Sequence, residues 1–194
     1  TLVRLFALGV PVDTTSLRWP AAHVLPDYGQ GGIHGLACSL RQWLHDPQAG
    51  CDPAEVAPGE AASIVLLVID GLGAHFLDTL GADSALGAHC RRRLTSVFPS
   101  TTASAITTLM TGASPAEHDL NGWFIHDRRF GGVIAPLPLE LRGNGPLQGT
   151  QITQRLFPQG SMFHGAERPT VMVSPREIAF SPYSRLHARG ARIR

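Results

Sequence analysis

The chain has 194 residues, of which 43% are hydrophobic and 16% charged, and its formal net charge is +1. This composition excludes an intrinsically disordered chain and is sufficient for one domain with a sizeable core. The near-zero charge gives no reason to expect nucleic acid or an acidic membrane surface as a partner. The longest apolar run, residues 64–69, is far too short to cross a bilayer, so we expect no membrane span.

Three cysteines, Cys38, Cys51 and Cys90, occur without a Cys-x-x-Cys pair. An odd count without that spacing predicts neither a disulfide framework nor a structural zinc site. We therefore expect idle thiols in a reducing compartment, which corresponds to a cytoplasmic location.

Residues 1–60 are predicted to form an N-terminal region of loops with one helix. Leu2–Val10 has the composition of a strand, and 46–60 that of a surface connection. Between them, the glycine-rich stretch Tyr28–His34 precedes a helical pattern of apolar residues over 36–44. A glycine loop before a helix can bind phosphate, but no Lys or Ser/Thr follows in the phosphate-loop pattern, so a simple turn is favoured.

Residues 61–194 are predicted to form an α/β core. Ile64–Ile69 is an unbroken apolar run, typical of a central parallel strand that is covered on both faces. Asp70 would then lie at the carboxyl end of that strand, where open α/β sheets bind their ligands. The apolar spacing predicts a helix over Thr102–Thr111, with Ser100 or Thr101 as its N-cap and Gly112 as its stop.

The remaining elements complete a mostly parallel sheet that is flanked by helices. We expect helices over 74–80, 84–93 and 152–156, strands over 94–97, 133–135 and 170–173, a loop over 136–149, and a solvated basic tail over 184–194.

Asp70 and Thr102 are the residues that carry chemistry. An ionised Asp is a hard oxygen ligand for a divalent cation, and a Thr hydroxyl becomes a nucleophile when a base or a metal favours loss of its proton. At a helix N-terminus, free backbone N–H groups can hold a phosphoryl oxygen. Each motif by itself is more often a simple turn or cap, and it is their order along the chain that points to a shared site.

The motifs resemble those of a known family. Ile64–Gly73, Phe98–Thr102, Leu109–Gly112 and Pro115–His118 together are similar to the alkaline phosphatase superfamily, and within it to the type I phosphodiesterase/nucleotide pyrophosphatase family. The resemblance implies an alkaline-phosphatase-like fold with two divalent metal ions, zinc or alternatively manganese. It also implies that Asp70 is a metal ligand and that Thr102 is both metal ligand and nucleophile, passing through a phospho-threonine intermediate.

The sequence departs from the family at several positions. An Asn that often follows the nucleophile by three residues is replaced by Ala105, a frequent Lys by Thr101, and the family's His-Gly by His118-Asp119. His118 is expected to be structural. The family also uses Asp-x-x-x-His, Asp-His and a final His as further metal ligands, and none of the remaining histidines has that spacing. We therefore expect 1–194 to be the N-terminal portion of a single catalytic domain, apparently truncated, with little activity of its own.

The predicted function is metal-dependent hydrolysis of a small-molecule phosphodiester or nucleotide. A phosphomonoesterase, or another hydrolase of the superfamily, is the first alternative. A folded, non-catalytic fragment is the second. The sequence does not indicate an oligomeric state, whether monomer or oligomer.

Overall fold

The computed structural model describes residues 24–45, 61–149 and 151–194. The predicted strand at 2–10 and the connection at 46–60 lie outside these residues. The described part contains short helices and short strands in the order α2 (Ile33–Leu44), α3 (Ala74–Leu80), α4 (Ala85–Ala88), α5 (Thr102–Thr111), α6 (Pro115–His118), β1 (Ile125–Asp127), the 3₁₀ helix η2 (Arg128–Phe130), β2 (Gly132–Ala135), β3 (Glu140–Leu141), β4 (Gly145–Pro146), α7 (Ile152–Leu156), β5 (Val171–Met172), α8 (Arg176–Ala179), α9 (Pro182–His187) and β6 (Arg192–Ile193).

The larger sheet is antiparallel, so the prediction of a mostly parallel sheet is wrong for the described residues. Strands β1 to β4 pair in chain order, each antiparallel to the next, because short turns connect them. Parallel pairing joins β5 to β6, as expected for 170–173, and also occurs as a single bridge between Gly32 and Thr95. The stretch 136–149, expected to be a loop, supplies β3 and β4.

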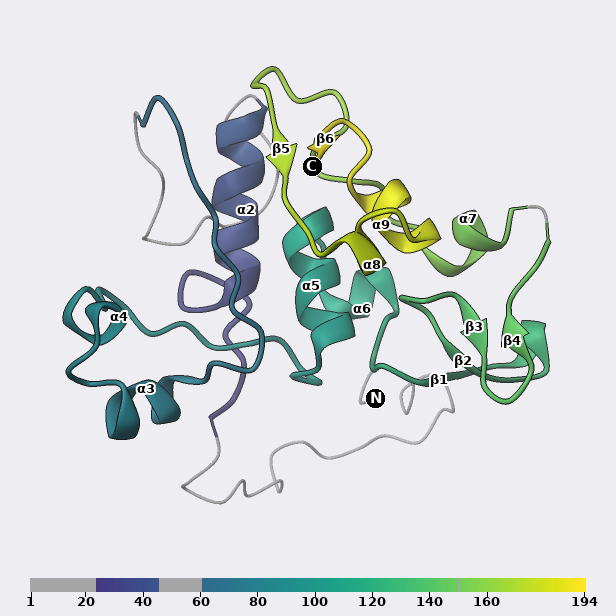
Figure 1. Cartoon of the computed structure of the whole chain (residues 1–194), viewed down its shortest axis with the longest axis horizontal. Helices are drawn as coiled ribbons and strands as arrows, with labels where there is room; N and C mark the ends of the chain where they lie inside the picture. The colour runs from purple at the N-terminus through teal and green to yellow at the C-terminus, as the bar shows by residue number, and fades with distance from the viewer. Residues whose placement is uncertain (1–23, 46–60, 150) are drawn as a thin grey trace, which may run out of the picture.

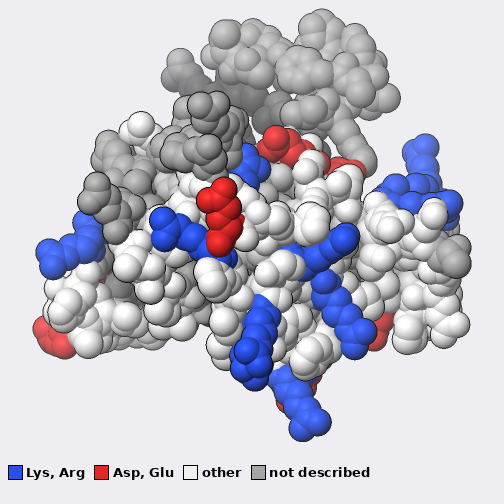
Figure 2. All heavy atoms as spheres, turned by 90° about the horizontal axis from the view of Figure 1, so that it is seen from above, with Lys and Arg blue, Asp and Glu red and all other residues white. Residues whose placement is uncertain are grey.

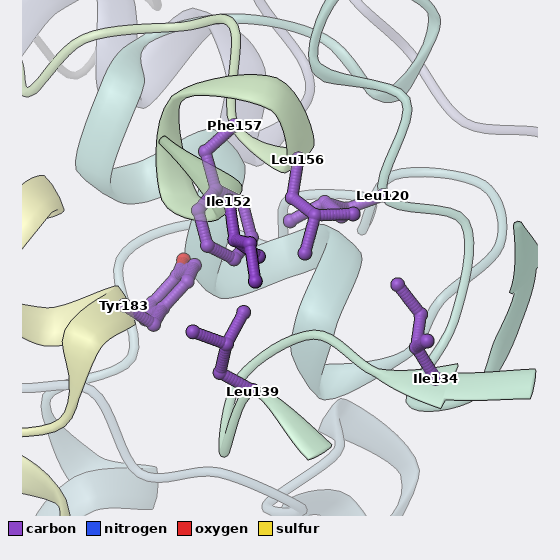
Figure 3. Packing of buried hydrophobic residues seen from close by; sticks show 7 residues of the cluster. All are labelled: Leu120, Ile134, Leu139, Ile152, Leu156, Phe157 and Tyr183. Atoms are coloured by element: carbon purple, nitrogen blue, oxygen red, sulfur yellow. The ribbon is translucent and has the colours of Figure 1, made fainter. Parts of the chain in front are cut away.

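Helices α2 and α5 pack against each other at the centre of the molecule (Figure 1). Both are predicted from the spacing of their apolar residues, and both lie where expected. Leu40 and Leu44 of α2 form a small core with Met162, while a second core lies between the antiparallel sheet and helices α7 and α9. Figure 3 shows the residues of this second core, which are Leu120, Ile134, Leu139, Ile152, Leu156, Phe157 and Tyr183.

The apolar run Ile64–Ile69 is not a buried central strand, which corrects the prediction. It is extended but belongs to no strand. Ile64 is partly buried against the core of Leu40, Leu44 and Met162, and the side chains of 65–69 are exposed, with Val65 92% and Leu67 73% accessible. No residue from 61 to 96 is buried. Helices α3 and α4 stand apart from the packed helices in Figure 1, while the start of the segment lies beside α2, where Trp43 Nε1 donates to the Ala61 carbonyl oxygen at 3.1 Å. We refer to residues 61–96 as the arm.

Two other local predictions need correction. The helix expected over 84–93 ends at Ala88, so Arg91–Arg93 is not helical. Cys38 is disulfide-bonded, so it is not an idle thiol; Cys90 is free and exposed, and Cys51 lies outside the described residues.

Charged side chains are dispersed over the face of the molecule that Figure 2 shows. Figure 2 shows arginine side chains separated by uncharged surface on the face seen from above. Within the described residues, no helix has both the length and the apolar character needed to cross a membrane.

Candidate active site

The start of α5 is built by local sequence. Thr101 is the N-cap, with extended backbone angles, and its side-chain oxygen accepts a hydrogen bond from the Ser104 N–H at 3.3 Å. Gly112 ends the helix in the left-handed conformation with φ 71°, which glycine adopts at no steric cost. Both ends therefore form as the sequence predicts, and Thr102 is the first residue of the helix.

Asp70 and Thr102 meet in the structure. The Thr102 hydroxyl donates a hydrogen bond to Oδ2 of Asp70 at 2.9 Å, across 32 positions of the chain. Asp70 is exposed and Thr102 is partly exposed, so both oxygens are accessible to solvent. The acid reaches this position from the turn at the end of 64–69, where Gly71 has a φ of 77°.

The first turn of α5 leaves further donors at this point. Within the described residues, the backbone N–H groups of Thr102 and Ala103 donate to no protein acceptor, as expected at a helix start. Ala105, in the place of the family's Asn, offers no polar side chain. The site can thus offer one carboxylate, one hydroxyl and two backbone donors to an anionic ligand.

The fit to a metal is partial. Carboxylate and hydroxyl oxygens suit a hard divalent cation, and the 2.9 Å between them allows both to contact one ion. Among the described residues, however, no group of three or more His, Cys, Asp and Glu side chains is placed to hold a metal. Asp70 and Thr102 therefore fit as two ligands of a single cation.

His118 is buried behind the site and is 1% exposed. The Leu120 N–H donates to its Nδ1 at 3.1 Å, so Nδ1 carries no hydrogen and Nε2 donates to the Thr108 hydroxyl at 3.2 Å. Burial lowers its pKa to about 4, which keeps the ring neutral at pH 7. These contacts fit the expected structural role.

Asp119 explains one departure from the family pattern. It caps α6 in the left-handed conformation with φ 59°. Glycine is the usual residue at such a position, and Asp is among the few others that tolerate it. The change from His-Gly to His118-Asp119 thus keeps the local turn.

The glycine-rich loop at 28–32 is not free to bind phosphate. The carboxylate of Asp27 already accepts hydrogen bonds from the N–H groups of Gly29 at 2.7 Å and Gly31 at 3.1 Å. A Cβ on Gly32 would collide with the Asp27 carbonyl oxygen. The glycines therefore serve close packing inside the loop, a role that was not foreseen from the sequence, although Asp27 before the glycines is a signal of it.

Comparison with known proteins supports the resemblance over part of the chain. Residues 64–142 match the model of the type I phosphodiesterase / nucleotide pyrophosphatase family, and both Asp70 and Thr102 lie inside this match. The match covers less than half of the chain and indicates a hydrolase of the phosphodiesterase or pyrophosphatase type. Neither the curated proteins nor the solved structures contain a significant match.

Proposed function

We propose that the protein takes part in hydrolysis of a phosphodiester or nucleotide pyrophosphate, with Thr102 as the nucleophile and Asp70 and Thr102 as ligands of one divalent cation. The observation that carries the proposal is the hydrogen bond from the Thr102 hydroxyl to Asp70 at the start of α5. The family match over 64–142 supports it independently. The same match is the reason to propose an alkaline-phosphatase-like fold for the complete domain.

Each residue has a stated task in this proposal. Asp70 orients the Thr102 hydroxyl, and Oγ1 attacks phosphorus as the bond from phosphorus to the leaving oxygen breaks. The departing oxygen leaves with a proton in place of the one lost by the Thr102 hydroxyl, and the intermediate is a phospho-threonine that keeps the second ester group of the substrate. Water then hydrolyses its bond to Thr102, which restores the hydroxyl and releases a phosphomonoester. The N–H groups of Thr102 and Ala103 would stabilise negative charge on a non-bridging oxygen. A bound cation would supply positive charge that favours the Thr102 alkoxide; zinc is the first choice and manganese the second.

The test compares Thr102→Ala with Thr102→Ser. With added zinc or manganese, hydrolysis of bis-p-nitrophenyl phosphate should disappear in Thr102→Ala and persist at a reduced rate in Thr102→Ser, which keeps a hydroxyl. Asp70→Asn should lower the metal content measured by elemental analysis. Normal turnover in Thr102→Ala, or unchanged metal content in Asp70→Asn, would contradict the respective assignment.

Two alternatives are separated by the same assay. A phosphomonoesterase would hydrolyse p-nitrophenyl phosphate faster than the diester. A non-catalytic protein would hydrolyse neither substrate.

A further inference from the structure

We infer that Tyr28 is a positioning residue for Thr102, an inference that rests on the proposed function of that threonine. The Tyr28 hydroxyl accepts a hydrogen bond from the Phe98 N–H at 3.0 Å and donates one to the Phe98 carbonyl oxygen at 3.4 Å. One side chain thus binds both polar backbone groups of a residue that lies four positions before the nucleophile.

The chain from Phe98 to α5 is short and internally bonded. The Thr101 N–H donates to the Pro99 carbonyl oxygen at 2.9 Å. Thr101 in turn accepts from the Ala105 N–H at 2.9 Å, which is the first bond of the helix. A shift of Phe98 would therefore be transmitted to the helix start, where Thr102 lies.

Tyr28 is itself held by the loop around it. The Asp27 N–H donates to Thr95 Oγ1 at 2.8 Å, and the Thr95 N–H donates to the Gly31 carbonyl oxygen at 2.9 Å. The Asp27 carboxylate closes the loop on Gly29 and Gly31. The Ile33 N–H, at the start of α2, donates to the Thr95 carbonyl oxygen at 2.9 Å. These bonds join the loop that carries Tyr28, the residues before Phe98 and the start of α2.

The arm that carries Asp70 makes this positioning matter. The arm has no buried residue, and in the described part of the chain the Thr102 hydroxyl makes the one hydrogen bond between Asp70 and α5. The hydroxyl is therefore the point on α5 to which Asp70 is bonded, so a displacement of the helix start would alter the contact between the two oxygens. Tyr28 bonds the backbone of Phe98, in the segment that leads into this helix start.

The experiment compares Tyr28→Phe with Tyr183→Phe, which together cover both tyrosines of the chain. Each substitution removes one hydroxyl from the surroundings of α5. Tyr183 is a matched control because its hydroxyl bonds the Thr107 hydroxyl, at 2.7 Å, and no backbone group before the helix. The readouts are amide hydrogen exchange at Phe98, the NMR signals of the Thr102 methyl group and the Asp70 carboxyl carbon, and turnover of bis-p-nitrophenyl phosphate.

For Tyr28→Phe we expect Phe98 exchange to rise about tenfold, both site signals to shift, and kcat to fall about tenfold or more with KM nearly unchanged. Tyr183→Phe should lower the unfolding midpoint without these changes. Unchanged exchange and unchanged site signals in Tyr28→Phe would overturn the inference. If Thr102→Ala shows that Thr102 is not the nucleophile, the turnover of Tyr28→Phe no longer tests the role of Tyr28. The hydrogen exchange at Phe98 and the NMR signals of Thr102 and Asp70 still decide whether Tyr28 holds the helix start.

Discussion

His187 is a buried residue whose sequence context, a basic tail, predicted exposure. Its ring lies against Phe157 and Tyr183, with centroids 5.2 Å and 4.2 Å away, and it is 0% exposed. Nδ1 faces the Tyr183 carbonyl oxygen at 3.1 Å and must donate to it, because a carbonyl can only accept. Nε2 is then a buried acceptor without a hydrogen-bond partner in the described structure.

We predict that His187→Phe stabilises the protein at pH 7. The phenyl ring keeps the aromatic packing, and the substitution removes a buried acceptor whose burial costs about 1–3 kcal/mol. Urea unfolding should show a gain of about 1 kcal/mol after the loss of the Nδ1 hydrogen bond is deducted. His164→Gln, an exposed site, serves as the control and should change little. A loss of stability in His187→Phe would show that the ring nitrogens make a favourable contribution.

We predict that the two buried histidines, His118 and His187, make the folded protein less stable at acidic pH. Burial lowers the pKa of each to about 4, from an ordinary value of 6.5. Between these two pH values the unfolded chain binds protons that the folded chain does not. The free energy of unfolding is therefore at its full value above pH 6.5 and decreases as pH falls towards 4. Glu117 and Asp127, whose hydrogen bonds lower their pKa values below 4.5 and 3.8, lose their contribution at lower pH.

The measurement is the free energy of unfolding by urea at pH 7 and pH 4.5. We expect a decrease on the order of 2 kcal/mol per buried histidine over this range. In His187→Phe only His118 still contributes to this pH dependence, so the free energy of unfolding should decrease about half as much. An equal decrease in the variant would assign the acid sensitivity to other groups.

At the scale of the element, α5 depends on its N-cap. We predict that Thr101→Ala costs about 1 kcal/mol, because the Ser104 N–H loses its side-chain acceptor. The loss should appear as faster amide exchange in the first turn of α5, and Thr101→Ser, which keeps the oxygen, should behave nearly like the unaltered chain. Equal exchange in the Ala and Ser variants would mean that the cap contributes nothing to the helix start.

Local patterns predict the helices well because each helix carries its own signals. The apolar spacing of 36–44, the Thr101 and Gly112 caps of α5, and the apolar residues of 152–156 all concern neighbours within a few positions. Of the predicted strands, 133–135 and 170–173 are confirmed as β2 and β5, whereas 64–69 forms no strand. Residues 64–69 have the composition of a buried strand, but pairing depends on a partner far away in the sequence, and the described residues provide none.

At the scale of the whole molecule, one contact of the candidate site was expected from the sequence. The order of the motifs around Asp70 and Thr102, together with the family resemblance, predicts that the two residues share a site, and the structure places their side-chain oxygens 2.9 Å apart. Their roles as metal ligand and nucleophile remain predictions. The contact of Tyr28 with Phe98, 70 positions away, has no such signal. The Tyr28 hydroxyl binds backbone groups of Phe98, which every residue type except proline carries, so the residue types in the sequence do not reveal this contact.

The exposed arm gives the last prediction. Val65 and Leu67 are 92% and 73% accessible and lie two positions apart in an extended segment, so both contribute to the apolar surface of the arm. We predict that the double substitution Val65→Lys and Leu67→Lys changes the free energy of unfolding by less than about 0.5 kcal/mol, because exposed side chains lose no buried contacts. Unfolding by urea, followed by circular dichroism, measures the change.

Ile134→Ala is the matched control, since Ile134 is an aliphatic residue that is 0% exposed in the core between the sheet and α7. It should cost about 2–5 kcal/mol, because removal of a buried side chain loses transfer free energy and leaves a cavity. The sequence alone predicts the opposite order of importance, with 64–69 at the centre of the sheet. If the two lysines cost several kcal/mol, residues 64–69 are buried as the sequence predicts and the exposed arm is wrong. If they cost little while Ile134→Ala costs much, the stabilising core is the one between the sheet and α7.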